Sequence, residues 1–143
     1  AKLHPGGMLG KRLLLKVSQI MHEKDRIPFV HVNMKVKDAL LIISEKGFGM
    51  TTVLNASDEM VGIITDGDIR RALEKNGNKI FDQTADNLMS KDPKWISSDT
   101  LAISALELMQ KHSITSLFVL SDINLKKPDG VIHIHDILKT GIQ

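Results

Sequence analysis

The sequence predicts an α+β fold in which one β-α-β-β-α unit occurs twice, the two copies packed as a pseudo-two-fold pair. The first observation is an internal repeat: residues 17–21 recur as residues 85–89, and residues 62–69 recur as residues 130–137, both displaced by 68 positions. The second is that each copy contains runs of apolar and β-branched residues, typical of strands, together with a stripe of apolar residues at helical spacing. A unit of this size is too small to close a core alone, so the copies are expected to bury their apolar faces against each other. A cleft between the halves is then the first place to expect a ligand.

Apolar runs and one stripe define the elements of the first copy. The stripe passes through Val36, Ala39, Leu40 and Ile43, and we expect a helix there. Asn33 is the expected N-cap and Gly47 the expected end of this helix. The elements, in order, are a helical or mixed segment at 13–21, a strand at 27–30, that helix, a hairpin with strands at 51–55 and 60–65, and a closing helix at 69–75 capped by Asp68.

The second copy repeats this order, with length changes confined to loops, as in a true structural repeat. Its elements are a strand around Trp95 and Ile96, a cap at Asp99, a stripe at Ala102, Ala105, Leu106 and Met109, strands at 117–120 and 131–134, and a helix from Asp136. The expected organisation is an arm at 1–16, a first repeat at 17–75, a polar connector at 76–84 and a second repeat at 85–143.

Composition excludes several function classes. Cysteine is absent, so disulfides and thiolate metal sites are excluded, and a reducing cytoplasm is the expected location. The net charge of +2 and the 3% aromatic content do not favour nucleic-acid binding. The longest unbroken apolar run, 39–43, is far shorter than the roughly 18 residues that a membrane span requires. No nucleophile elbow or phosphate-binding Gly-rich loop with lysine is present.

The first copy ends in the most informative local pattern, Thr65-Asp66-Gly67-Asp68. A buried strand ends in a hydroxyl, turns at Gly67 and begins a helix, so a hydroxyl, a carboxylate and free amides meet at one sheet edge. A sugar phosphate could use the amides and Thr65 for phosphate and Asp68 for sugar hydroxyls, with Arg70 or Arg71 neutralising its charge. The same spacing also suits a simple helix cap, so both interpretations stay open.

The second copy keeps the carboxylate as Asp136 but has His133 in place of the threonine. His133 and His135 lie two apart and would share one face of a strand, which is a partial metal-site pattern. No third ligand is evident in the sequence, so packed or solvated histidines are the alternative, and no metal is expected. If both copies bind a ligand, they need not bind it equally.

The tandem order and the Gly-apolar-x-Thr-x-x-Asp ending resemble a pair of cystathionine-β-synthase (CBS) domains, regulatory modules that bind adenosyl and other nucleotides. The resemblance covers Val17 to Thr140. The sequence departs from the CBS pattern in two ways: Thr52 and Phe118 stand where many CBS domains have proline, and His133 fills the hydroxyl position of the second copy. The resemblance implies a first ligand site at Phe29, Val30, Met50, Thr51, Thr52, Val53, Thr65 and Asp68, and a second at Trp95, Ile96, Ser116, Leu117, Phe118, Val119, His133 and Asp136.

The segment from Leu3 to Val17, with Ile20-Met21-His22 and Ile27-Pro28 after it, resembles the junction of D-arabinose-5-phosphate isomerases of the sugar isomerase family. In those enzymes a sugar-isomerase domain precedes the CBS pair and interconverts ribulose 5-phosphate and arabinose 5-phosphate on the route to Kdo. The His-Pro-Gly-Gly segment of that family carries an active-site histidine, and the resemblance assigns this role to His4. An imidazole suits proton transfer or ring opening in an aldose-ketose isomerisation. Without the rest of that site, we expect no turnover from this chain alone.

Two functional hypotheses follow from the resemblance. The first is a regulatory module that binds AMP, ATP or the pathway product CMP-Kdo, needs no other cofactor, and acts on an N-terminal isomerase domain of the same protein. The second is a ligand-independent oligomerisation module of the same enzyme. A homo-oligomer is expected under both hypotheses, and neither nucleic acid nor a membrane is an expected partner.

Overall fold

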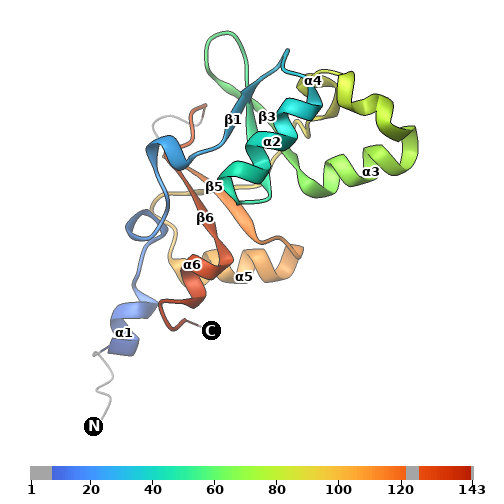
Figure 1. Ribbon diagram of the computed structural model, residues 1–143. Helices are drawn as coiled ribbons and strands as arrows, with labels where there is room; N and C mark the ends of the chain where they lie inside the picture. The colour runs from blue at the N-terminus through green and yellow to red at the C-terminus, as the bar shows by residue number, and fades with distance from the viewer. Residues whose placement is uncertain (1–7, 122–125, 143) are drawn as a thin grey trace. The chain divides into compact units, whose positions relative to one another are not determined.

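The computed structural model describes residues 8–121 and 126–142, which divide into two compact units. One unit, here called the first unit, is Asp25–Lys94. The other, here called the second unit, joins the segment up to Lys24 with the segment from Trp95 onward. Each unit has one three-stranded sheet with helices beside it (Figure 1). The predicted α+β class with two β-α-β-β-α units is therefore confirmed. Among the residues described, no helix combines the length and the apolar character needed to cross a bilayer.

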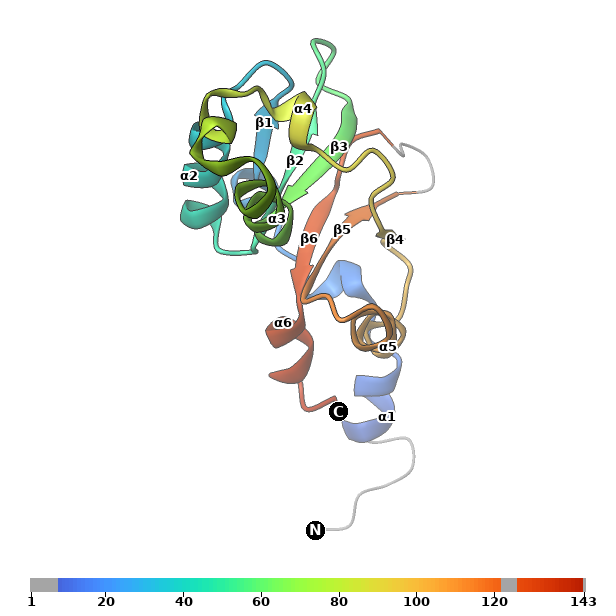
Figure 2. The ribbon, with the colours of Figure 1, turned by 90° about the vertical axis from the view of Figure 1, so that its right-hand side faces the viewer.

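The sheet of the unit Asp25–Lys94 has the order β1-β2-β3. Strand β1 runs parallel to β2, and β3 runs antiparallel to β2, as the expected hairpin requires. Figure 2 shows α2 and α3 on the same face of this sheet. The elements are η2 (Lys24–Arg26), β1 (Phe29–His31), α2 (Val36–Lys46), β2 (Met50–Leu54), β3 (Met60–Thr65), α3 (Asp66–Asn76), η3 (Gly77–Asp82) and α4 (Ala85–Leu88).

Helix α2 forms where the apolar stripe predicts it. Val36, Ala39 and Ile43 are buried in the core of this unit. Gly47 ends the helix at φ 82, in the left-handed region that glycine adopts without a steric penalty. The expected cap at Asn33 is wrong: Lys35 is the N-cap residue and provides no side-chain hydrogen bond.

The connector is not a solvated linker throughout. Residues 77–82 form the 3-10 helix η3, which contacts both α2 and α3. Ile80 is fully buried in the same core as Val36 and Ile69. The apolar pair Ile80-Phe81 stands alone among polar residues and shows no periodicity, so the sequence pattern could not reveal the burial of Ile80.

The second unit repeats the arrangement with the order β4-β5-β6, again one parallel and one antiparallel pair. All four predicted stripe residues, Ala102, Ala105, Leu106 and Met109, are buried. Helices α5 and α6 pack against each other. The expected cap at Asp99 is wrong, because Leu101 is the N-cap residue. The elements are α1 (Met8–Leu13), η1 (Val17–Gln19), β4 (Trp95–Ser97), α5 (Ala102–His112), β5 (Ser116–Leu120), β6 (Gly130–His133) and α6 (Ile134–Leu138).

Each sheet also receives a short segment that is distant in sequence. Residues 17–22, here called the N-terminal strap, lie against β6 through an antiparallel bridge between His22 and Val131. Residues 85–90, here called the middle strap, lie against β3 through the equivalent bridge between Ser90 and Ile63. The segment that opens each sequence repeat therefore packs on the sheet formed largely by the other repeat.

Candidate ligand-binding positions

The turn between β3 and α3 is organised as a capping box. The Thr65 hydroxyl accepts a hydrogen bond from the Asp68 backbone N–H at 3.1 Å, and Asp68 Oδ2 accepts one from the Thr65 N–H at 2.9 Å. Asp68 Oδ1 pairs with Arg71 Nη2 at 2.9 Å, while Arg70 is exposed on the same helix. The N-cap residue is Thr65, so the predicted cap at Asp68 is wrong. Thr65 and Asp68, both predicted as ligand-binding residues, are the two side chains that form the capping box.

The other expected residues of this unit lie in the sheet, where Phe29 pairs with Thr52 and Met50 pairs with Thr65. Phe29 is exposed, whereas Met50, Thr51 and Thr52 are buried. The Thr52 hydroxyl donates to the Pro28 carbonyl at 2.8 Å, and the Thr51 hydroxyl donates to the Thr52 carbonyl at 3.0 Å. The remaining two residues, Val30 and Val53, place their side chains in the hydrophobic core.

The second unit has the same pairing but leaves one hydroxyl unsatisfied. Trp95 pairs with Phe118, and Ser116 pairs with His133. Ser116 is 8% exposed, and its Oγ is the buried side-chain polar atom without a hydrogen-bond partner among the described residues. Such groups are rare, because burying a hydroxyl without a partner costs about 1–3 kcal/mol. The hydrophobic core of this unit contains the side chains of Ile96, Leu117 and Val119.

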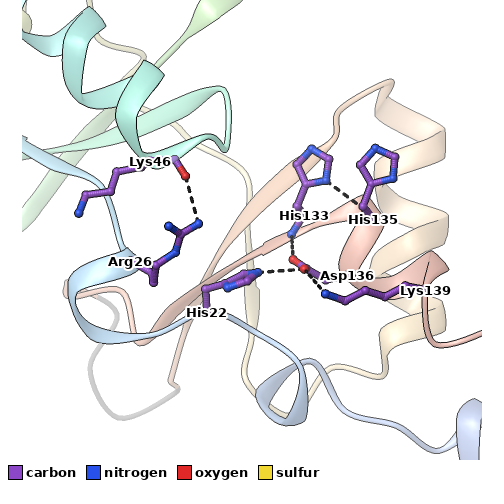
Figure 3. Close-up of polar contacts among 7 residues, drawn as sticks. All are labelled: His22, Arg26, Lys46, His133, His135, Asp136 and Lys139. Carbon is purple, nitrogen blue, oxygen red and sulfur yellow. Dashed lines mark hydrogen bonds and ion pairs between the residues drawn. The ribbon is translucent and has the colours of Figure 1, made fainter.

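Asp136 is the centre of a polar cluster, shown in Figure 3. Its Oδ2 accepts from the His133 backbone N–H at 2.8 Å, which repeats the capping box of the first unit. Its Oδ1 lies 2.9 Å from His22 Nε2 and 3.6 Å from Lys139 Nζ. The Asp136 side chain is only 8% exposed, so these partners compensate a buried carboxylate.

The surroundings of His133 disfavour its protonated form. Burial lowers its pKa below the ordinary 6.5, neighbouring His135 and His22 lower it further, and Asp136 acts in the opposite direction. Its Nδ1 accepts a hydrogen bond from the His135 backbone N–H at 3.1 Å, which a proton on that nitrogen would abolish. Helix α6 is thus capped by an imidazole where α3 is capped by a hydroxyl.

Replacing His133 with threonine, the residue at the equivalent position 65, is expected to reduce the acid sensitivity of the fold. Because the pKa of His133 is lowered on folding, the unfolded chain binds more protons just below pH 6.5, so the wild-type free energy of unfolding falls as the pH drops from about 7 to about 5. H133T keeps a capping oxygen without this titration. Chemical denaturation across that pH range measures the difference, and identical pH slopes for the two proteins would contradict it.

The two histidines of this cluster lie against each other. The rings of His133 and His135 stack with centroids 4.9 Å apart, and the His135 side chain is exposed. Within residues 8–121 and 126–142, no group of three potential ligands is arranged to hold a metal ion.

Two residues that were not predicted as site residues contact Asp136 in the structure, and one predicted residue lies outside the described part of the chain. His22 and Lys139 both reach Asp136, and neither was expected to contribute. Lys139 could have been found from the repeat, because it stands at the position equivalent to Arg71. His22 could not have been found from the repeat, because it reaches Asp136 only through the packing of the N-terminal strap on β6. His4 lies outside the described residues.

The repeated three-stranded sheet and the duplicated capping turn define a class of tandem-repeat α+β proteins. The CBS domain family model matches residues 17–75 and 85–142, so the chain belongs to the CBS domain family. Known structures share the fold at low sequence identity. A CBS-domain containing protein from Agrobacterium tumefaciens aligns with a TM-score of 0.79 at 18% identity, covering 99% of this chain and all of that one.

Two further similar structures contain adenosine derivatives. The CBS domain pair of protein MJ0100, in complex with 5′-methylthioadenosine and S-adenosyl-L-methionine, has a TM-score of 0.74 at 21% identity and covers 88% of this chain and 94% of its own. CBSX2 in complex with AMP has a TM-score of 0.72 at 21% identity and covers 89% of this chain and 96% of its own.

The curated sequence relatives include arabinose 5-phosphate isomerases. The chain is 39% identical over 139 residues to the arabinose 5-phosphate isomerase KdsD of Pseudomonas aeruginosa and 42% identical to that of Salmonella typhimurium. Both alignments cover 97% of this chain but only 42% and 41% of the relatives. The chain therefore spans about two fifths of the length of the curated relatives it matches. The predicted resemblance to the CBS pair of these isomerases is confirmed.

Proposed function

We propose that this chain is the regulatory CBS pair of an arabinose-5-phosphate isomerase and binds a nucleotide or nucleotide-sugar. The named activity of the relatives supports the parent enzyme, and the AMP and the adenosine derivatives bound in two similar CBS structures support the ligand class. AMP, ATP and CMP-Kdo are the candidate ligands. The proposal includes a cytoplasmic protein that converts ribulose 5-phosphate to arabinose 5-phosphate for Kdo synthesis. In that protein His4 serves an isomerase domain outside this chain, and this chain alone has no turnover.

The single observation that carries the ligand-binding proposal is the unsatisfied hydroxyl of Ser116. A buried hydroxyl without a partner is tolerated where a ligand supplies the missing hydrogen bond. Its strand partner is His133, whose protonated form is disfavoured, and Trp95 on the neighbouring strand is 38% exposed. A hydroxyl, an imidazole and an indole suit a sugar and a base better than they suit a metal ion.

The first unit would bind differently, since its polar groups are already paired. Asp68 Oδ1 is held by Arg71, whose side chain is 64% exposed and can move at little cost. A ligand ribose would take over Asp68, while Arg71 or Arg70 would turn to the phosphate.

Replacing Ser116 with alanine is expected to weaken nucleotide binding roughly 3- to 10-fold without destabilising the free protein, because the lost hydrogen bond exists only in the complex. Isothermal titration calorimetry with AMP, ATP, CMP and CMP-Kdo measures the affinity. S104A is the matched control, since it makes the same chemical change at an exposed position of α5. Absence of heat with all four nucleotides at about millimolar concentration would contradict the proposed ligand class.

The ligand-independent oligomerisation module remains the second candidate because of one surface feature. Leu41 on α2 is 66% exposed, and Leu73 on α3 is 40% exposed. Large apolar side chains left on helices of one unit are typical of surfaces that pack against another chain. Sedimentation with and without nucleotide separates the hypotheses, since a pure oligomerisation module associates to the same extent in both conditions.

A further inference from the structure

The N-terminal strap is attached to the second unit by backbone and side-chain contacts together. The His22 N–H donates to the Val131 carbonyl at 2.8 Å, and the Val131 N–H donates back to the His22 carbonyl at 2.9 Å. At the other end of the strap, Val17 is fully buried, and its N–H donates to the Thr100 carbonyl at 2.8 Å. The N-terminal strap is therefore an integral part of a unit whose sheet begins at residue 95.

The middle strap is attached by the same backbone contacts. The Ser90 N–H donates to the Ile63 carbonyl at 2.8 Å, and the Ile63 N–H donates to the Ser90 carbonyl at 3.0 Å. The straps differ in the side chain at the bridging position, which is an imidazole in one and a short hydroxyl in the other. The middle strap therefore serves as an internal reference for the N-terminal strap.

This difference changes which group satisfies the capping carboxylate. In the second unit, His22 Nε2 on the strap contacts Asp136 Oδ1 at 2.9 Å, and Lys139 lies farther away at 3.6 Å. In the first unit, Asp68 Oδ1 is paired with Arg71 of its own helix. Figure 3 shows His22 of the N-terminal strap beside Asp136. Among the described residues, the middle strap makes no such side-chain contact with Asp68.

We propose that His22 is a latch that couples occupation of Asp136 to attachment of the N-terminal strap. The coupling rests on the proposed function, because it requires a ligand whose hydroxyl groups hydrogen-bond to Asp136. Such a ligand competes with His22 for Oδ1, so binding loosens residues 17–22 from β6. A ligand on Asp68 displaces only Arg71 and leaves the middle strap in place. The second site therefore transmits its occupancy to the segment at the N-terminal side of the CBS pair, and the first site does not.

The latch itself is testable without ligand by amide hydrogen exchange. In H22A, the amides of position 22 and Val131 are expected to exchange roughly tenfold faster than in the wild type, because a charge-assisted hydrogen bond is lost. H22Q keeps a side-chain N–H donor and is expected to retain part of the protection. The amides of Ile63 and Ser90 report on the middle strap and should not change. Equal protection of the N-terminal strap in wild type, H22A and H22Q would overturn the latch.

The coupling is tested by repeating the exchange measurement with AMP and with CMP-Kdo, after calorimetry has shown whether each binds. The expected result is faster exchange at His22 and Val131 in the bound wild type, with Ile63 and Ser90 unchanged. Binding that leaves the N-terminal strap equally or more protected would overturn the coupling but not the proposed function. Absence of binding by AMP, ATP, CMP and CMP-Kdo would overturn the proposed function and the coupling together, while the latch is still decided by H22A.

Discussion

Replacing Gly130 with alanine is expected to destabilise the second unit by about 1–3 kcal/mol, as overpacking of a closed site does. A Cβ at this position would lie 2.8 Å from Met21 Cγ and 2.9 Å from the His22 carbonyl oxygen. The methionine can shift, but the carbonyl is fixed by its hydrogen bond to the Val131 N–H. The clash should therefore detach the N-terminal strap from β6. Hydrogen exchange at the Val131 amide, combined with urea denaturation, measures the effect.

The matched control is Gly62 in the first unit. A Cβ there would lie 2.7 Å from the Ser90 carbonyl oxygen and 2.8 Å from Met89 Sδ, so G62A should release the middle strap and expose the Ile63 amide. Each variant is thus expected to affect its own unit first. In the double variant G130A/M21A, part of the lost stability should return, because only the backbone contact remains. Uniform loss of protection in both units after either substitution would contradict strap-specific packing.

The two glycines illustrate what the repeat predicts and what it does not. The equal spacing of Met21 from Met89 and of Gly62 from Gly130 marks both pairs as equivalent. The sequence cannot show that Met21 packs on Gly130, because the preference of a residue for its own sheet or for a distant one leaves no local pattern. Long-range pairing of this kind is decided by the whole fold.

The helices were predictable because their signals are local. The stripe on α2 and the left-handed Gly47 depend on residues within a few turns, and both are present as expected. The caps were harder, because Asn33 and Asp99 are good capping residues that lie just before the positions where the helices begin. At α3 the prediction gave Asp68 the role of the N-cap, whereas Thr65 holds it and Asp68 completes the box.

The candidate site was partly predictable for the same reason. The turn that holds Thr65 and Asp68 is local, and its counterpart with His133 and Asp136 follows from the repeat. The unsatisfied hydroxyl of Ser116 and the contact of His22 with Asp136 both depend on which side chains surround a position in three dimensions. Burial and pairing of that kind are properties of the folded chain.

Replacing Ile80 with alanine is expected to destabilise the first unit by about 2–5 kcal/mol, the cost of a cavity at a fully buried aliphatic side chain. Ile80 lies in η3, which contacts both α2 and α3, so the cavity would loosen both helices from each other. A solvated connector, the role that the polar sequence around it suggested, would tolerate the same change. Urea denaturation monitored by circular dichroism, with amide exchange at Val53 and Ile64, measures the loss.

Two control variants separate burial from a general sensitivity of this segment. I80V removes one methyl group and should cost only about 0.5–1.5 kcal/mol. N78A changes an exposed residue of the same 3-10 helix and should stay within about 0.5 kcal/mol of the wild type. If I80A is no more costly than N78A, then η3 does not close the core. If the loss of stability instead increases from N78A to I80V to I80A, then residues 77–82 belong to the core of the first unit. A first repeat truncated after residue 75 would then lack part of its own core.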